Sequence, residues 1–195
     1  MIEKNDVINF FDKCAPTWDA EMIRDDAIIG TILDNAGLHG GEKVLDVACG
    51  TGVLIGDYLA RNVASVTGVD ISPEMIRLAR EKFSDPRVRF LCGDVESIDL
   101  PSDFDAVVVY NAFPHFPDPA ALIARLSRLL RSGGTLTVAH GMSREKIDAH
   151  HHNVAHSVSM GLMEADKLAG IFAGHLSVTA VISDDKMYQV VGRKE

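Results

Sequence analysis

Short runs of apolar residues recur along the chain, separated by segments in which apolar residues have helical spacing. Five runs predict strands, at residues 42–49, 64–70, 87–92, 104–111 and 135–140. Between them, apolar positions that recur every three or four residues predict helices at residues 25–36, 53–61, 73–83 and 119–130. The run at 104–111 is apolar without alternation, which is typical of a parallel strand covered on both faces.

This alternation predicts an α/β fold, a Rossmann-like, doubly wound and mostly parallel sheet with helices on both faces. The C-terminal part breaks the pattern, because two strands joined at Asp184-Asp185 predict an antiparallel hairpin at one edge, at residues 176–183 and 186–193. Further helices are expected at residues 5–11, 143–157 and 163–173. Gly133-Gly134 is expected to close the helix before it. No linker or repeat is visible, so residues 1–195 are expected to form a single domain.

The charge balance narrows the possible functions. The chain has 28 acidic and 19 basic side chains, a formal net charge of −9, and no long basic block. Nucleic acids and anionic membranes are bound through clustered Lys and Arg, so neither is an expected partner. No stretch reaches the length of a membrane span, and the first residues lack a signal-peptide layout. The three cysteines show no Cys-x-x-Cys spacing and suit buried positions in a reducing cytosol, which predicts a cytoplasmic protein.

A glycine turn follows the first predicted strand, in the stretch DVACGTG from Asp46 to Gly52. Ligands of open α/β sheets bind beyond the carboxyl ends of the strands, and Gly50 and Gly52 allow a ligand close to the backbone. The stretch is not a Walker loop, because no Gly-Lys-Ser follows. It also lacks the third glycine of a dinucleotide fingerprint, where Ile55 stands. Asp46 would repel a pyrophosphate and attract a cation.

Two more carboxylates end the next two predicted strands. Asp70 lies twenty residues after Gly50, where an acidic side chain typically accepts hydrogen bonds from both ribose hydroxyls. Asp94 ends the third strand and could accept from an exocyclic amine, while the N–H of Val95 could donate to an adenine ring nitrogen. The three strand ends together describe a ligand with an adenine, an unphosphorylated ribose and a cationic tail. S-adenosylmethionine fits this description.

The chain also resembles the class I S-adenosylmethionine-dependent methyltransferases, in the group that includes the C-methyltransferases of ubiquinone and menaquinone biosynthesis. The resemblance rests on the stretches VLDVACGTG, VTGVDISPEMIRLAR, FLCGDVESIDLP, FDAVVVYNAFPHFPD and ALIARLSRLLRSGGTLTVA, which follow in the family's order and spacing. It implies S-adenosylmethionine as cofactor, bound by Asp46, Ala48, Gly50, Gly52, Asp70, Ile71, Met75, Gly93, Asp94, Val95, Asn111 and Trp18.

The N-terminal stretch FFDKCAPTWD is similar to an element that folds over the cofactor in this family. The resemblance therefore implies a cap at residues 1–24, in which Trp18 or Phe11 shields the sulfonium. It also implies a variable substrate lid at residues 141–163. Met75 is expected to pack on the adenine face, although plain packing in a helix core is the alternative.

Three histidines are candidates for catalysis. His140 ends the fifth predicted strand and is expected to face the substrate cavity. The chain is similar to relatives with His-Gly-x-Ser-Arg-Glu followed by a histidine about ten residues later, and His140 and His151 match those positions. His115 stands where many small-molecule relatives carry a histidine. It is either a general base, a substrate contact or a surface imidazole. The Asn-Pro-Pro-Tyr motif of amine methyltransferases is absent, because Asn111 begins Asn-Ala-Phe-Pro.

Histidines are also concentrated in the stretch before residue 157. If this stretch is helical, Asp148, His152 and His156 lie on one face at four-residue spacing, which suits a divalent metal. The candidate metal ligands are His140, His151, His152 and His156. An exposed polar lid helix is the alternative.

The predicted function is S-adenosylmethionine-dependent transfer of a methyl group to a small-molecule acceptor, without nucleic acid or membrane as partner. The alternative is a module that binds S-adenosylmethionine and a metal without transferase activity. The apolar, histidine-rich lid could also serve as an interface, so a homodimer is a further expectation.

Overall fold

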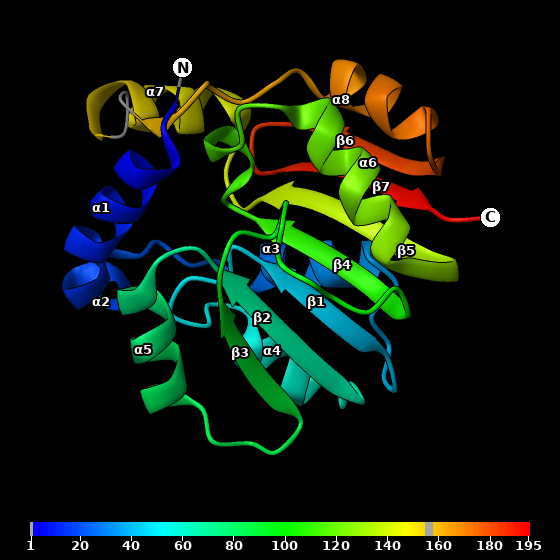
Figure 1. Cartoon of the computed structure of the whole chain (residues 1–195). Helices are drawn as coiled ribbons and strands as arrows, with labels where there is room; N and C mark the ends of the chain where they lie inside the picture. Colours follow the sequence, from blue (N-terminus) through cyan, green and yellow to red (C-terminus); the bar gives the residue numbers. More distant parts are fainter. Residues whose placement is uncertain (1, 155–157) are drawn as a thin grey trace.

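A single seven-stranded sheet organises the molecule (Figure 1). The computed structural model describes residues 2–154 and 158–195. The strands follow the order β3-β2-β1-β4-β5-β7-β6. Their bounds are β1 Lys43–Val47, β2 Ser65–Asp70, β3 Val88–Cys92, β4 Phe104–Tyr110, β5 Leu130–His140, β6 Ser177–Ser183 and β7 Tyr188–Arg193. The pairs from β3 to β5 are parallel, whereas β7 is antiparallel to both β5 and β6. The predicted Rossmann-like α/β fold is therefore confirmed.

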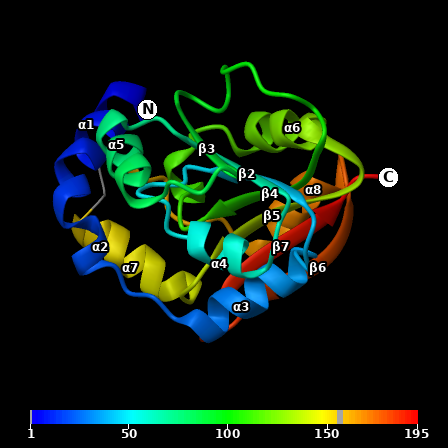
Figure 2. The same ribbon diagram turned by 90° about the horizontal axis from the view of Figure 1, so that it is seen from below.

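Helices cover both faces of the sheet (Figure 2). One apolar cluster includes buried side chains of three helices, α3 Asp26–Asn35, α4 Ile55–Ala60 and α5 Pro73–Lys82. The other includes side chains of α6 Pro119–Leu129 and α8 Ala165–Ala173. Neighbouring strand residues alternate between the clusters, as Val44 and Leu45 do in β1. Burial on both faces explains why these strands are apolar without alternation.

The remaining helices gather at the end of the sheet where the parallel strands terminate (Figures 1 and 2). The N-terminal segment forms α1 Lys4–Cys14, the 3-10 helix η1 Ala15–Thr17 and the short helix α2 Trp18–Glu21. A second 3-10 helix, η2 Phe113–His115, follows β4, and α7 Arg144–Val154 follows β5. In the described part of the chain, no helix has the length and apolar character needed to cross a membrane.

The Gly133-Gly134 pair differs from its prediction. Helix α6 ends at Leu129, and β5 begins at the next residue, so both glycines lie inside the strand. The pairing of β5 with β4 shifts here, from Phe104 with Leu130 to Ala106 with Thr135. A Cβ on Gly134 would lie 2.9 Å from the carbonyl oxygen of Phe104. The pair therefore makes a bulge that brings the two backbones close, and it is not a helix cap.

Candidate active site

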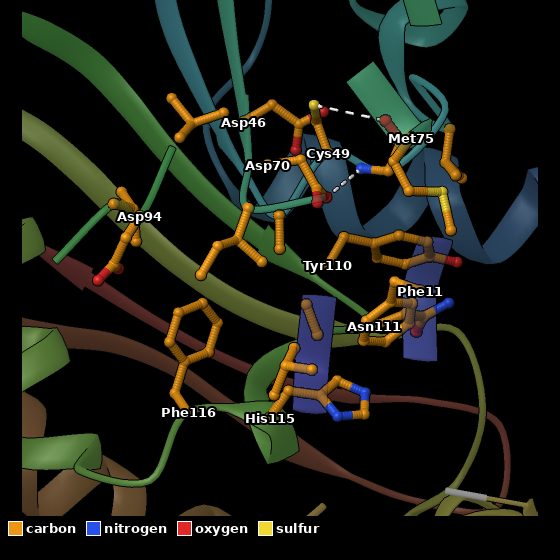
Figure 3. A pocket seen from close by; sticks show the side chains of 18 of the residues that line it. Phe11, Asp46, Cys49, Asp70, Met75, Asp94, Tyr110, Asn111, His115 and Phe116 are labelled. Atoms are coloured by element: carbon orange, nitrogen blue, oxygen red, sulfur yellow. Dashed lines mark hydrogen bonds between the residues drawn. The ribbon is translucent and has the colours of Figure 1, made fainter. Parts of the chain in front are cut away.

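A cavity of about 1130 Å³, including its open mouth, lies beyond the carboxyl ends of β1, β2 and β4. Almost every predicted cofactor-binding residue lines this one space: Asp46, Ala48, Gly50, Asp70, Ile71, Met75, Gly93, Asp94, Val95, Asn111 and Trp18. Asp46, Asp70 and Met75 lie on one side of it, and His115 and Phe116 lie on the opposite side (Figure 3).

Gly50 shapes the wall of the cavity through its backbone. Its φ of 55° is left-handed, a conformation that glycine adopts readily. A Cβ at this position would lie 3.7 Å from Nε1 of Trp18 and 4.0 Å from Sδ of Met75. The missing side chain therefore keeps space between the turn and these two residues. Gly52 is not among the cavity-lining residues, and a Cβ there would lie 2.8 Å from the ring of Phe83, so Gly52 serves packing.

Asp70 is held in place by the backbone around the turn. One carboxylate oxygen accepts a hydrogen bond from the N–H of Gly50 at 2.8 Å (Figure 3). The other accepts from the N–H of Ser72 at 2.9 Å. Burial raises the pKa of Asp70 to about 6, and these backbone hydrogen bonds oppose the rise. Each oxygen keeps a second lone pair, so Asp70 can still accept from a ligand.

Asp46 is the most deeply buried carboxyl group of the cavity, with 2% of its surface exposed. Burial, followed by the nearby charge of Asp70, raises its pKa to about 8. No hydrogen bond of ordinary geometry reaches its buried Oδ2 within the described residues, and the buried hydroxyl of Tyr58 interacts with this carboxyl group and opposes the rise in its pKa. An acceptor in this state favours a cationic or hydrogen-bond-donating ligand group, as the sequence predicts.

The third acidic residue, Asp94, already has partners in this structure. Its Oδ1 accepts from the N–H of Glu96 at 2.9 Å, and its Oδ2 accepts from the ammonium group of Lys4 on α1. Lys4 also pairs with Glu96 at 3.0 Å. An adenine amine would share Asp94 with this lysine. Lys4 was not predicted as a site residue, since nothing in a lone N-terminal lysine indicates a partner ninety residues away.

Aromatic side chains also line the cavity. Phe11 packs edge-on against Trp18 with ring centres 5.7 Å apart, and edge-on against His115 at 5.0 Å. His115 is fixed by its Nδ1, which lies 2.7 Å from the carbonyl oxygen of Val158. Asn111 accepts from the N–H of Gly141 at 3.0 Å. Phe116 and Tyr110 also line the cavity, and the sequence did not single them out.

His140 is placed differently from its prediction. It is 1% exposed, packs edge-on against Tyr188 of β7 with ring centres 5.9 Å apart, and is not among the cavity-lining residues. It pairs with Tyr188 across the antiparallel ladder, so its ring meets the C-terminal hairpin. The sequence predicted the end of the strand correctly, but not the direction of the side chain. A catalytic role for His140 stays a prediction.

The other predicted metal ligands cannot be placed. His156 lies outside the described residues, and the structure describes only the backbone of His151 and His152, within α7. Among the described side chains, no group of three His, Cys, Asp or Glu could hold a metal ion. Asp148, expected on the same helix face, accepts a hydrogen bond from the N–H of Leu162 at 2.8 Å.

Comparison with known proteins agrees with this geometry. The model of the methyltransferase domain family matches residues 44–134, which include the glycine turn, the three carboxylates and Asn111. Residues 44–134 are a methyltransferase domain. Malonyl-[acyl-carrier protein] O-methyltransferase of Acetivibrio thermocellus is 34% identical over 139 residues, which cover 70% of this chain and 49% of that protein. The chain thus spans about half the length of this curated relative.

Solved structures of methyltransferases share the fold of this chain. A chain in the complex of the Haloferax volcanii Trm112 methyltransferase activator with a methyltransferase superposes with a TM-score of 0.84, at 21% identity and 96% coverage of both chains. Magnesium protoporphyrin IX methyltransferase of Synechocystis PCC 6803, solved with bound SAH, superposes with a TM-score of 0.73. It is 15% identical, and the match covers 99% of this chain and all of that one.

Proposed function

We propose that the chain transfers a methyl group from S-adenosylmethionine to a small, largely apolar molecule. The observation that carries this proposal is a cavity beyond the parallel strands that is lined both by three carboxyl groups and by aromatic rings. The family match of residues 44–134 supports the chemistry, and the name of the 34%-identical relative favours an oxygen acceptor.

The residues present fit this cofactor. Asp70 would accept from the ribose hydroxyls, and Asp94 and Val95 would bind the adenine amine and a ring nitrogen. Met75, which is buried and lines the cavity, would pack on the adenine. The buried carboxyl group of Asp46, which lines the cavity, would accept from the ammonium group of the methionyl end. When bound, the cofactor supplies an electrophilic methyl group on a good leaving group.

The protein's part in the reaction is mainly to align the acceptor and exclude water. Phe11 and Trp18 would cover the reacting centre, because both line the cavity from the N-terminal segment. Alignment of this kind contributes up to ~7–11 kcal/mol in ideal cases. His115 would remove the acceptor's proton. If its Nδ1–H donates to the carbonyl of Val158, the lone pair of the neutral ring lies on Nε2.

The proposal predicts that the protein binds SAH and forms it from S-adenosylmethionine when a suitable acceptor is present. Calorimetry would measure SAH binding, and a screen of phenols, carboxylic acids and quinols would be followed by SAH release. His115→Gln should lower turnover by ~10²–10⁴-fold and remove the fall of activity on the acidic side of the pH profile, because the proton acceptor is lost.

Two controls make this test decisive. SAH affinity should be unchanged in His115→Gln, and His175→Gln should behave as wild type, because His175 is exposed and does not line the cavity. Failure of the wild type to bind SAH would contradict the proposed function. Equal turnover of His115→Gln and wild type would remove His115 from the mechanism.

The metal hypothesis is tested by the same calorimetry. Titration with zinc, nickel or cobalt salts would detect binding through His151, His152 and His156. Tight metal binding without methyl transfer to any acceptor would favour the alternative, a binding module without transferase activity.

Light scattering would test the expected homodimer, and cell fractionation would test the cytoplasmic location.

A further inference from the structure

A second cavity lies next to the first. It measures about 1360 Å³ including its open mouth, and it is lined from η2, from α7 and from the segment that leads into α8. Phe116 and Pro117 line both cavities, so the two spaces are neighbours across these residues. His115 lines the first cavity, and Pro114, which precedes it, lines the second. A ligand of the second cavity would therefore lie close to the candidate base of the first.

Residues 158–162 connect the second cavity to His115. The N–H of Met160 donates to the carbonyl oxygen of Pro114 at 2.8 Å, and the carbonyl oxygen of Val158 lies 2.7 Å from Nδ1 of His115. Met160 lines the second cavity. A molecule in this cavity therefore touches the same segment that holds the imidazole in place.

Helix α7 holds the other end of this segment through both backbone groups of Leu162. The N–H of Leu162 donates to the carboxylate of Asp148 at 2.8 Å, and its carbonyl oxygen accepts from Nε of Arg144 at 2.8 Å. Gly161 has a left-handed φ of 76°, which lets the chain turn before Leu162. The wall of the cavity is thus formed before a ligand binds, and binding orders little additional chain.

The lining of the second cavity is mainly apolar. Phe113 and Phe116 line it from η2 and the residue that follows, and Met160, Leu162 and Met163 line it from the segment before α8. Aromatic and thioether side chains adapt to ring systems and alkyl chains of different shapes. Met160 is 64% exposed in spite of its apolar side chain, so a ligand at this place would cover it.

The charges of the lining balance. Its four charged side chains, among the residues that the structure describes, form two pairs of opposite sign. Nε of Arg144 lies 3.7 Å from Oδ2 of Asp148, and Nζ of Lys167 lies 2.9 Å from Oε2 of Glu164. A charged ligand group would lose its hydration here without a net attraction in return. The lining therefore favours an uncharged group.

We infer that the second cavity binds the uncharged, apolar end of the methyl acceptor, either a ring or an alkyl chain, while the reacting group stays in the first cavity beside His115. The acceptor crosses between the cavities at Phe116 and Pro117, which line both. This inference rests on the proposed function, and it makes the acceptor an elongated molecule with a polar head and an apolar tail.

The first test uses N-phenyl-1-naphthylamine, an uncharged aromatic probe whose fluorescence rises in apolar surroundings, with protein saturated with SAH. One probe molecule should bind per chain. Met160→Glu should weaken this binding by about 10-fold or more, because the variant loses an apolar contact and places a charge at the cavity. Equal probe affinity of the variant and wild type would overturn the inference.

Ile23→Glu is the matched control, because Ile23 is 75% exposed and lines neither cavity. It should bind the probe as wild type does, and equal loss in both variants would also overturn the inference. Both variants should keep wild-type affinity for SAH, since Met160 does not line the first cavity. No SAH binding by wild type would instead contradict the proposed function, and the probe titration without SAH would still report on the second cavity.

The second test asks whether the occupant is part of the acceptor. Phenol, benzoic acid and hydroquinone would be compared with their hexyl-substituted forms, first as competitors of the probe and then as acceptors. The hexyl forms should displace the probe. For the accepted head group, the hexyl form should have a KM lower by about 10-fold or more at similar kcat, because the chain binds equally in the ground and transition states.

Met160→Glu should bring the KM values of the short and hexyl forms together, whereas Ile23→Glu should keep them apart. Failure of the hexyl forms to displace the probe would overturn the inference. Equal KM values of the two forms with wild type would overturn it as well, and would leave methyl transfer itself intact.

Discussion

At the residue scale, the buried carboxyl group of Asp46 lowers the stability of the folded protein when it ionises. Its folded pKa of about 8 is well above the unfolded value of ~3.9. The folded state therefore binds a proton more tightly than the unfolded chain. The stability that this proton contributes is complete below pH ~4 and is lost as the pH rises towards 8. Each pH unit in this window removes roughly 1 kcal/mol.

Asp46→Asn should remove this pH dependence, because the amide resembles the protonated acid in size and carries no charge. The free energy of unfolding in urea would be measured at pH 6, 7 and 8. The variant should gain on wild type by roughly 1 kcal/mol per pH unit. Parallel stability profiles would contradict the assignment. Asp103→Asn is a matched control, since Asp103 is exposed and pairs only with Lys43.

The same carboxyl group predicts a pH dependence of cofactor binding. A cationic ligand group favours ionised Asp46, so binding releases a proton and affinity rises with pH up to about 8. Calorimetry in buffers of different ionisation enthalpy would count the released protons. Asp46→Asn should bind SAH more weakly and release fewer protons. Identical proton release in the two proteins would show that another group titrates.

At the element scale, the N-terminal segment is tied to the sheet at three places. Lys4 pairs with Asp94 after β3, Asp12 accepts from the hydroxyl of Ser72 after β2, and Asp19 accepts from Thr51 after β1. Each contact thus joins α1 or α2 to the residues that follow a different strand. Residues of the N-terminal segment and residues at the strand ends both line the cavity. The three contacts therefore hold the N-terminal segment, which covers the cavity, against the strand ends.

The double variant Asp12→Asn, Asp19→Asn should loosen this cover. Hydrogen bonds of this kind contribute ~0.5–1.5 kcal/mol each, so SAH should dissociate several times faster. Stopped-flow fluorescence of Trp18 would measure the rate. Asp6→Asn serves as the control, because Asp6 is exposed on the same helix α1. Equal dissociation rates in the double variant and wild type would show that the contacts of Asp12 and Asp19 do not hold the cover.

The sequence predicted the elements better than the contacts between them. Apolar runs located the five parallel strands, and the signal is strongest in β1 and β4, which are buried on both faces. Gly133-Gly134 was misread as a helix end, since a helix cap and a strand bulge both use glycine. The contact of Asp12 with Ser72 joins residues sixty positions apart, and no local pattern encodes it. The burial of His140 against Tyr188 likewise depends on how the hairpin folds back.

At the scale of the whole molecule, strand β7 joins the hairpin to the rest of the sheet. A Cβ on Gly192 would lie 2.7 Å from the ring of Phe172 and 2.9 Å from Cβ of Leu176. Gly192→Ala should therefore destabilise the protein by ~1–3 kcal/mol through overpacking. Gly170→Ala on α8 has free space around it and should stabilise by ~0.5–1 kcal/mol, because alanine favours the helix. Thermal unfolding of both variants would check these opposite signs.

The place of β7 in the sheet also bears on how the chain is made. Because β7 pairs with β5 on one side and β6 on the other, the sheet cannot be completed until residues 188–193 have left the ribosome. Until then β5 and β6 carry unpaired backbone groups that can associate with other nascent chains. A nascent chain stalled on the ribosome before residue 188 should therefore be sensitive to protease. The yield of folded protein in cells should depend on chaperones.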